Sequence, residues 1–296
     1  MVQLSELNRV AIAEICVYTP SLFIAILLSI RHGFGRSSGW MYLILFSVMR
    51  ILGSGLQLGT IDDPTNVSLY IGASTLQSIG LSPLILTMLG LLSRVLGSIR
   101  QNRTTLITPR HIRLVQILVL VGLVMGVVGG SKMGSVVSRA IEDGNRNYAI
   151  PGATRAGLAL TISGYGILTI ATSSTGFQVR SAEPGEKRLL LANALALPFM
   201  LVKVVYSCLA TYTTEPNFRA FGGSIATYTN YLLGMSVIME MAAVAIIEGI
   251  GLTLQRATVG QKEAETPLGT VTSPPTYSSE PVPTPSHYQE SGVERV

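Results

Sequence analysis

Long apolar stretches separated by short polar segments dominate the first 256 residues of the chain. An α-helix rises about 1.5 Å per residue, so roughly 20 apolar residues cross the ~30 Å hydrocarbon core of a bilayer. Seven stretches reach that length, at about residues 10–30, 40–59, 69–92, 114–135, 156–177, 189–211 and 225–254. The pattern therefore predicts an all-α membrane bundle of seven transmembrane helices over residues 1–256.

Residues 257–296 have a different composition, rich in Pro, Ser, Thr and Glu. A segment of this kind cannot bury enough apolar surface to fold, so we expect a disordered tail. It contains Pro274-Pro275-Thr276-Tyr277, which fits the PPxY pattern that WW domains bind. A WW-domain ubiquitin ligase is therefore a candidate partner of the tail, and an inert spacer is the alternative.

The composition places the chain in the membrane class, with 48% hydrophobic and 12% charged residues against about 25% charged in soluble domains. The net charge of +5 does not imply a nucleic-acid partner, because membrane proteins gather Lys and Arg in their cytoplasmic loops. Cys16 and Cys208 lie in apolar stretches and fit small hydrophobic residues rather than a disulfide. His32, His111 and His287 are predicted in loops or the tail. We therefore expect no metal site and no cofactor.

The basic residues are unevenly divided between the two sides of the predicted bundle. The side of the tail has 13 Lys and Arg, and the opposite side has 6. The positive-inside rule then places the tail in the cytoplasm and the N-terminus outside, in the plasma membrane or an endomembrane. Asn66-Val67-Ser68 falls outside in this orientation, so Asn66 is a candidate for N-glycosylation.

Several polar residues lie inside the predicted spans. Arg50 is near the middle of the second span, where an arginine costs roughly 3 kcal/mol or more unless it faces the bundle and finds a partner. The other intramembrane polar residues at similar depth are Glu14, Gln57, Gln77, Lys203 and Glu240. We expect these groups to converge on one cavity.

The roles of these residues stay open at this point. Candidates for ligand binding are Arg50, Gln57, Gln77, Lys203 and Tyr206, and candidates for acid catalysis are Glu14 and Glu240. The alternative is structural, with Arg50 paired to Glu240, or Lys203 to Glu14, to lock the bundle.

Other positions predict packing rather than chemistry. Gly122, Gly126, Gly130 and Gly134 repeat every four residues. This spacing predicts a helix face against which a neighbouring backbone packs closely. Trp40 is expected to anchor the interface, as amphipathic rings do. Glu248 lies near the inner boundary and is expected to be solvated.

Several segments carry a resemblance to a known family. They are the span of Arg50 and IRHGFGRSSGW (30–40), NVSLYIGA (66–73), LQSIGLSPLIL (76–86), LLSRVL (91–96), GEKRLLLA (185–192), LPFMLVKVVYS (197–207) and IEGIGLTLQ (247–255). Over about residues 5–256 the chain resembles an uncharacterised fungal family of seven-helix integral membrane proteins, known as a domain of unknown function. The resemblance implies a fungal membrane protein, sometimes encoded near secondary-metabolism genes, and brings no catalytic residue.

Three functions are compatible with these features. The first is the handling of a lipophilic small molecule, in transport, sensing or a metabolic pathway, through an intramembrane polar cavity. The second is a membrane-bound cyclase similar to terpene cyclases, with Glu14 or Glu240 as the acid. The third is a seven-helix receptor. The third span ends in LLSRVLGSIR without the acidic-Arg-Tyr signature of G-protein-coupled receptors, which disfavours the receptor.

Overall fold

A computed structural model describes residues 5–32, 38–102, 109–142, 148–178, 184–219 and 224–254. By its internal contacts the chain divides into two units, Met1–Arg256 and Ala257–Val296. The predicted tail, with Pro274, Pro275 and Tyr277, lies outside the described residues.

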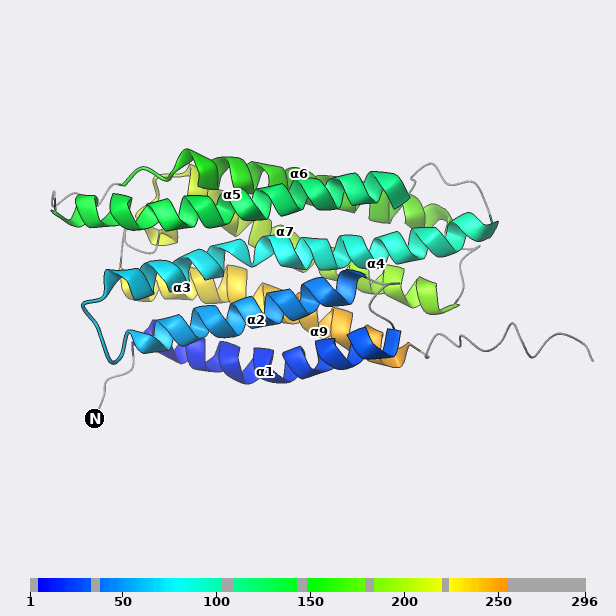
Figure 1. The fold of residues 1–296 in the computed structure, drawn as a ribbon, viewed down its shortest axis with the longest axis horizontal. Coiled ribbons are helices and arrows are strands. Elements are labelled where there is room, and N and C mark those ends of the chain that lie inside the picture. Colours follow the sequence, from blue (N-terminus) through cyan, green and yellow to red (C-terminus); the bar gives the residue numbers. More distant parts are fainter. Residues whose placement is uncertain are drawn as a thin grey trace, which may run out of the picture. The chain divides into compact units, whose positions relative to one another are not determined.

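The described part is all-helical (Figure 1). Its elements are α1 (Glu6–His32), α2 (Ser38–Gly59), α3 (Val67–Ile79), α4 (Leu81–Asn102), α5 (Pro109–Glu142), α6 (Gly152–Gln178), α7 (Pro184–Tyr212), the 3-10 helix η2 (Pro216–Phe218), α8 (Ile225–Leu232), the π-helix η3 (Leu233–Val237) and α9 (Ile238–Thr253). Seven segments of these elements are long and apolar enough to cross a membrane. The prediction of seven transmembrane helices is confirmed.

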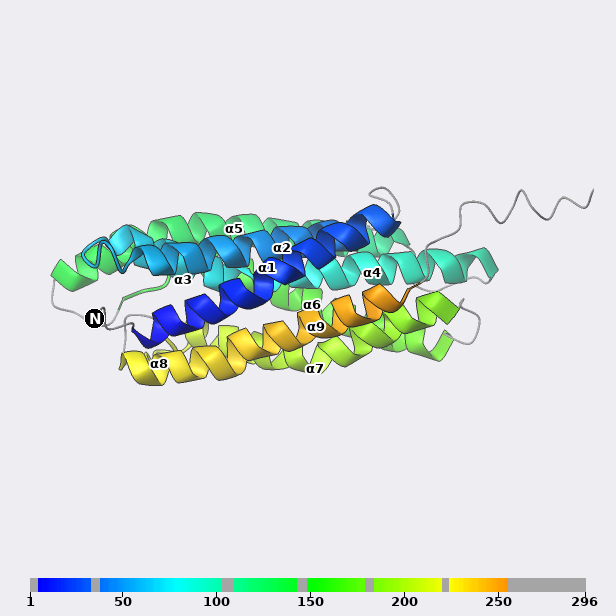
Figure 2. The same cartoon turned by 90° about the horizontal axis from the view of Figure 1, so that it is seen from below.

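The third and seventh spans are each built from more than one element. The third span consists of α3 and α4, which meet at Gly80. The seventh consists of α8, η3 and α9, which follow one another beside α7 (Figure 2). The break of the third span lies at Gly80, the C-cap of α3. A side chain at this position would collide with the guanidinium of Arg50, so the close approach of Arg50 requires glycine.

Helix α4 lies in the middle of the bundle, where it packs against α2, α5, α6 and α7. Its residues Leu84, Leu89 and Val95 are fully buried. On the outer helices, large apolar side chains such as Phe23 of α1 and Ile170 of α6 are exposed instead. An apolar surface around a buried core is the arrangement that lipid requires.

The close approach predicted from the glycine repeat is confirmed between α5 and α6. A Cβ atom on Gly122 of α5 would lie 2.8 Å from the carbonyl oxygen of Gly157 on α6. A Cβ atom on Gly157 would in turn lie 2.6 Å from the carbonyl oxygen of Gly122. These distances leave no room for side chains, so the glycine face is used for packing inside the chain.

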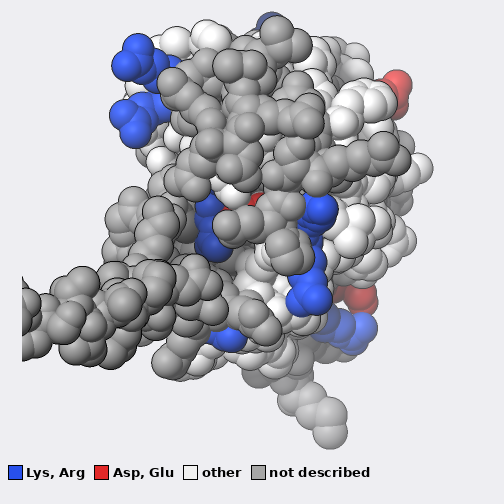
Figure 3. All heavy atoms as spheres, turned by 90° about the vertical axis from the view of Figure 1, so that its right-hand side faces the viewer, with Lys and Arg blue, Asp and Glu red and all other residues white. Residues whose placement is uncertain are grey.

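The bundle has two ends with different charge. We call the end that holds Glu6 and Gly59 the first end, and the end that holds His32 and Pro109 the second end. Among the residues whose side chains are described, the bases at the second end are Arg31, Arg94, Arg110, Arg113, Lys187 and Arg188. Figure 3 views this end and shows Lys and Arg side chains on it.

Trp40 is not an interface anchor. Its side chain is fully buried at the second end, and its ring stacks on His32 with the centroids 5.9 Å apart. A Cβ atom on Gly251 would lie 2.6 Å from the Trp40 ring, so the indole fills the space that this glycine leaves. Trp40 therefore belongs to the apolar core of the second-end half.

Candidate functional site

Arg50 of α2 is the centre of a buried polar network. Its side chain is only 1% exposed, and its guanidinium forms an ion pair with Glu240 of α9. It also donates to the side chain of Gln77, and its Nη2 lies 3.2 Å from the backbone oxygen of that residue. Arg50 therefore faces the bundle, and its predicted pairing with Glu240 is confirmed.

Lys203 of α7 joins the same carboxylate. Its Nζ lies 2.8 Å from Oε1 of Glu240 and 2.6 Å from Oγ of Ser236, to which it donates. The predicted pairing of Lys203 with Glu14 is wrong, because Glu240 sits between the two cations and binds both. Glu240 itself is 0% exposed.

Glu14 of α1 occupies the other side of the network. Its carboxylate accepts hydrogen bonds from Ser54, at 2.7 Å, and from Nε2 of Gln77, at 3.1 Å. Nη1 of Arg50 lies 4.0 Å from Glu14, at the limit of an ion pair. Gln77 thus connects Glu14 to Arg50, and residues from five spans meet here.

The network is electrically balanced. It has two cations, Arg50 and Lys203, and two carboxylates, Glu14 and Glu240. A buried charge without a partner costs several kcal/mol, so this balance is what allows four ionisable groups to lie within the membrane-spanning bundle.

The π-helix η3 places two of the partners of Lys203. Ser236 lies within η3, and Glu240 follows in the first turn of α9. Each backbone hydrogen bond of a π-helix spans five residues, one more than in an α-helix. Such turns are frequent at functional sites. The wider turn sets the direction from which Ser236 and Glu240 approach Lys203.

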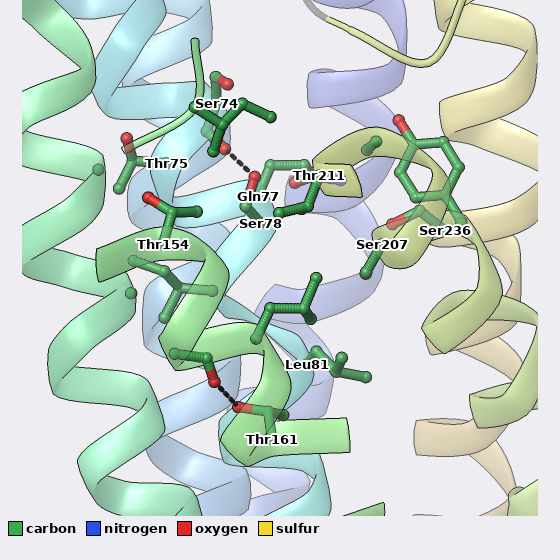
Figure 4. Close-up of a pocket in the computed structure, with 18 of the residues that line it drawn as sticks. Ser74, Thr75, Gln77, Ser78, Leu81, Thr154, Thr161, Ser207, Thr211 and Ser236 are labelled. Carbon is green, nitrogen blue, oxygen red and sulfur yellow. Dashed lines mark hydrogen bonds between the residues drawn. The ribbon is translucent and has the colours of Figure 1, made fainter. Parts of the chain in front are cut away.

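A cavity of about 150 Å³ adjoins the network in the first-end half of the bundle. Lys203, Ser236 and Gln77 of the network line it. Its wall is mostly apolar, and hydroxyl groups from different helices also line it, as Figure 4 shows: Ser74 and Thr75 of α3, Thr154 of α6, and Ser207 and Thr211 of α7. The cavity thus combines a mostly apolar wall with several hydroxyl groups and the charged side chains of Lys203 and Arg219.

A smaller cavity of about 60 Å³ lies on the other side of Gln77. Glu14, Ser54 and Gln57 contribute to its wall. Nε2 of Gln57 donates to Oδ1 of Asn8 at 3.0 Å. Arg50 lines neither cavity and lies between them, so its contacts in this structure are with the protein itself.

The predicted ligand-binding residues are therefore divided. Gln77, Lys203 and Tyr206 line the larger cavity, Gln57 and Gln77 line the smaller one, and Arg50 joins the network behind both. Of the two candidate acids, Glu14 lines only the smaller cavity, and Glu240 lines neither. Glu240 is held by two cations, and the described lining of the larger cavity contains no free carboxylic acid.

Asn66 lies at the first end, where it caps α3. Its side chain accepts a hydrogen bond from the backbone N–H of Ser68, at 3.2 Å. Only the carboxamide oxygen takes part in this bond, and the side-chain NH2, which a glycan would modify, is not used by it.

Glu248 is buried, contrary to the expectation that it is solvated. Its side chain is 6% exposed and accepts a hydrogen bond from Ser21 at 2.6 Å. The expectation followed from the position of Glu248 near the end of its helix. It is wrong because the face of α9 that carries Glu248 packs against α1.

Sequence reasoning missed three residues of this region. Ser54 and Ser236 complete the bonding of Glu14 and Lys203, and Arg219 lines the mouth of the larger cavity. Ser residues are too common in membrane helices to stand out. Arg219 falls in a predicted loop, where an arginine is ordinary.

Comparison with known families gives one match. The family described as a domain of unknown function, DUF7702, matches residues 4–257, which include every described element. No curated protein and no solved structure matches the chain.

Proposed function

The chain belongs to the DUF7702 family, and from that premise and the geometry of the cavity we propose that it binds a lipophilic small molecule inside its membrane-spanning bundle. The observation that carries the proposal is that Lys203, Ser236 and Gln77 of the polar network line the larger cavity. Pockets that bind small molecules are mostly apolar with a few convergent polar groups. This cavity has both features.

Binding is favoured over catalysis by an intramembrane acid for a geometric reason. A general acid must reach the reacting atom of its substrate. Glu240 is enclosed by Arg50 and Lys203, and Glu14 is separated from the larger cavity by Gln77. The likeness to fungal proteins near secondary-metabolism genes supports a lipophilic metabolite as the ligand, transported or sensed in the plasma membrane or an endomembrane.

A cavity-filling substitution tests the proposal. Ser207→Phe places a ring in the cavity, whereas Val205→Phe adds the same ring on the same helix at a side chain that is 43% exposed on the outer surface. Each purified variant is incubated with a lipophilic culture extract, and the retained compounds are identified by mass spectrometry.

We expect the wild-type protein and Val205→Phe to retain the same compound and Ser207→Phe to lose it. Size-exclusion profiles confirm that each variant is folded. Equal retention by folded Ser207→Phe would contradict binding in this cavity.

A further inference from the structure

Arg219 differs from the other charged residues of the cavity. It lines the mouth of the larger cavity at the first end, and its side chain is 7% exposed. Lys203 is the other base in the wall, and it pairs with Glu240. In the part of the chain that the structure describes, Arg219 forms no ion pair with a carboxylate.

The contacts of Arg219 are all with neutral groups. Nη1 donates to the backbone oxygen of Tyr148 at 3.0 Å, and Nη2 donates to that of Thr213 at 2.7 Å. The guanidinium also lies over the ring of Tyr148, 5.4 Å from its centroid. Nε is buried and has no hydrogen-bond partner among the described residues.

Two of the five N–H groups of the guanidinium are thus used, and the group keeps its full positive charge. The backbone oxygens hold it in place without compensating that charge. The nearby Glu215 is exposed and is not paired with it in the described region. Because the deep network is neutral, Arg219 gives the described lining of the cavity a net positive charge.

We propose that Arg219 binds the carboxylate of a small amphipathic acid whose apolar body fills the larger cavity. The inference rests on the proposed function and adds the charge of the ligand. A guanidinium forms charge-assisted hydrogen bonds with carboxylates, and these are about twice as strong as neutral ones. A cavity of roughly 150 Å³ can hold a benzene-sized group, so the volume of about 150 Å³ fits one ring or a short chain.

The experiment compares two probes that differ in charge but little in shape, 4-ethylbenzoate and 4-ethylbenzamide. Their affinities are measured calorimetrically for the full-length protein in nanodiscs of neutral phosphatidylcholine, with empty nanodiscs as the control for partition into lipid. We expect the carboxylate to bind about tenfold more tightly than the amide.

Arg219→Gln should remove this preference, because glutamine can still donate to backbone oxygens but has no charge. Arg219→Lys should keep part of it. If Arg219 only fixed the loop, both probes would weaken equally in Arg219→Gln and their affinity ratio would not change, which would overturn the inference.

The failure of the inference can be separated from that of the proposed function. Equal binding of both probes to the wild-type protein refutes the anion site and leaves the binding cavity in place. Binding of neither probe up to its solubility limit also refutes the anion site, and the comparison of Ser207→Phe with Val205→Phe then decides whether the cavity binds another ligand.

The bilayer itself also contains oxyanions. Titration in nanodiscs with anionic phosphatidylglycerol separates the two sources. Unchanged carboxylate binding supports a free small acid, and loss of that binding through competition assigns the site to a lipid headgroup and overturns the small-acid proposal.

Discussion

Glu240 is the carboxylate that pairs with both cations of the buried polar network. It is fully buried and bridges Arg50 and Lys203, which come from two different helices. Removing one partner from a buried ion pair is far more damaging than replacing the whole pair, because it leaves a charge without compensation. Glu240 pairs with two buried cations, so its loss has a larger effect than the loss of a surface ion pair.

We therefore predict that Glu240→Ala lowers the free energy of unfolding by about 3–5 kcal/mol. The fraction of purified protein that stays monodisperse after heating in mild detergent measures this change. Glu6→Ala is the matched control, because Glu6 pairs with Arg9 at the exposed surface, where ion pairs contribute little.

A second variant keeps this test specific to charge. In Glu240→Gln combined with Lys203→Met, one cation is removed together with the acid, and Arg50 keeps Glu14 nearby. We expect the double variant to lose less stability than the sum of its two single variants. A strictly additive result would speak against the network.

At the scale of elements, two irregularities in the helices flank the network. The junction of α3 and α4 at Gly80 lies against the guanidinium of Arg50, and the π-helix η3 carries Ser236 to Lys203. If each span were one regular α-helix, different residues would face the charged groups. This is because each added or removed residue rotates the following part of the helix by about 100°. The two irregularities therefore belong to the site.

Gly80→Ala tests the first of them. The added methyl group would collide with the guanidinium of Arg50, which cannot move freely because Glu240 and Gln77 hold it. We expect a loss of about 1–3 kcal/mol of stability, as for other overpacked cores, measured by the same heating assay.

Gly97→Ala in α4 is the matched control, because a Cβ atom at Gly97 meets nothing within 4 Å. Alanine is also the better helix former, so this variant should be as stable as the wild-type protein or slightly more so. Equal stability of the Gly80 and Gly97 variants would show that the contact with Arg50 is unimportant.

For the molecule as a whole, the two halves of the membrane-spanning unit differ. The first-end half contains the polar network and both cavities that adjoin it. The second-end half contains much of the apolar core, including Trp40, Leu92 and Leu189. In the described residues the cavities that adjoin the network lie toward the first end, so we expect the proposed ligand to enter from that end.

The orientation of the bundle leads to a prediction about glycosylation. The basic second end should face the cytoplasm, which places Asn66 at the first end on the opposite side. In a eukaryotic host we expect the protein to migrate faster on gels after N-glycosidase treatment, and Asn66→Gln to remove that shift.

Asn102 provides an internal control. The segment Asn102-Arg103-Thr104 also fits the acceptor pattern, but it begins at the last residue of α4, which ends at the basic second end. Asn102→Gln should leave the gel shift unchanged. If Asn102→Gln removes the shift and Asn66→Gln does not, the orientation is reversed.

The positions of the spans and the need to pair Arg50 followed from the sequence. So did the close packing at Gly122, because a run of small residues at helical spacing leaves space that a neighbouring backbone must fill. The position of Trp40 and the burial of Glu248 did not follow. The burial of each side chain depends on which face of its helix packs against other helices. The distance of a residue from the end of its helix does not show which face it is on.

The amino-acid sequence alone determined that the chain forms seven apolar helices and that its intramembrane charges face inward. Both conclusions rest on the free energy of placing groups in hydrocarbon, which depends on residue type and on length along the chain. Only the tertiary structure decided that Lys203 binds Glu240 rather than Glu14, and that the cavity extends toward Arg219. Those outcomes depend on helix rotation and on the irregular turns at Gly80 and η3, which no residue pattern specifies by itself.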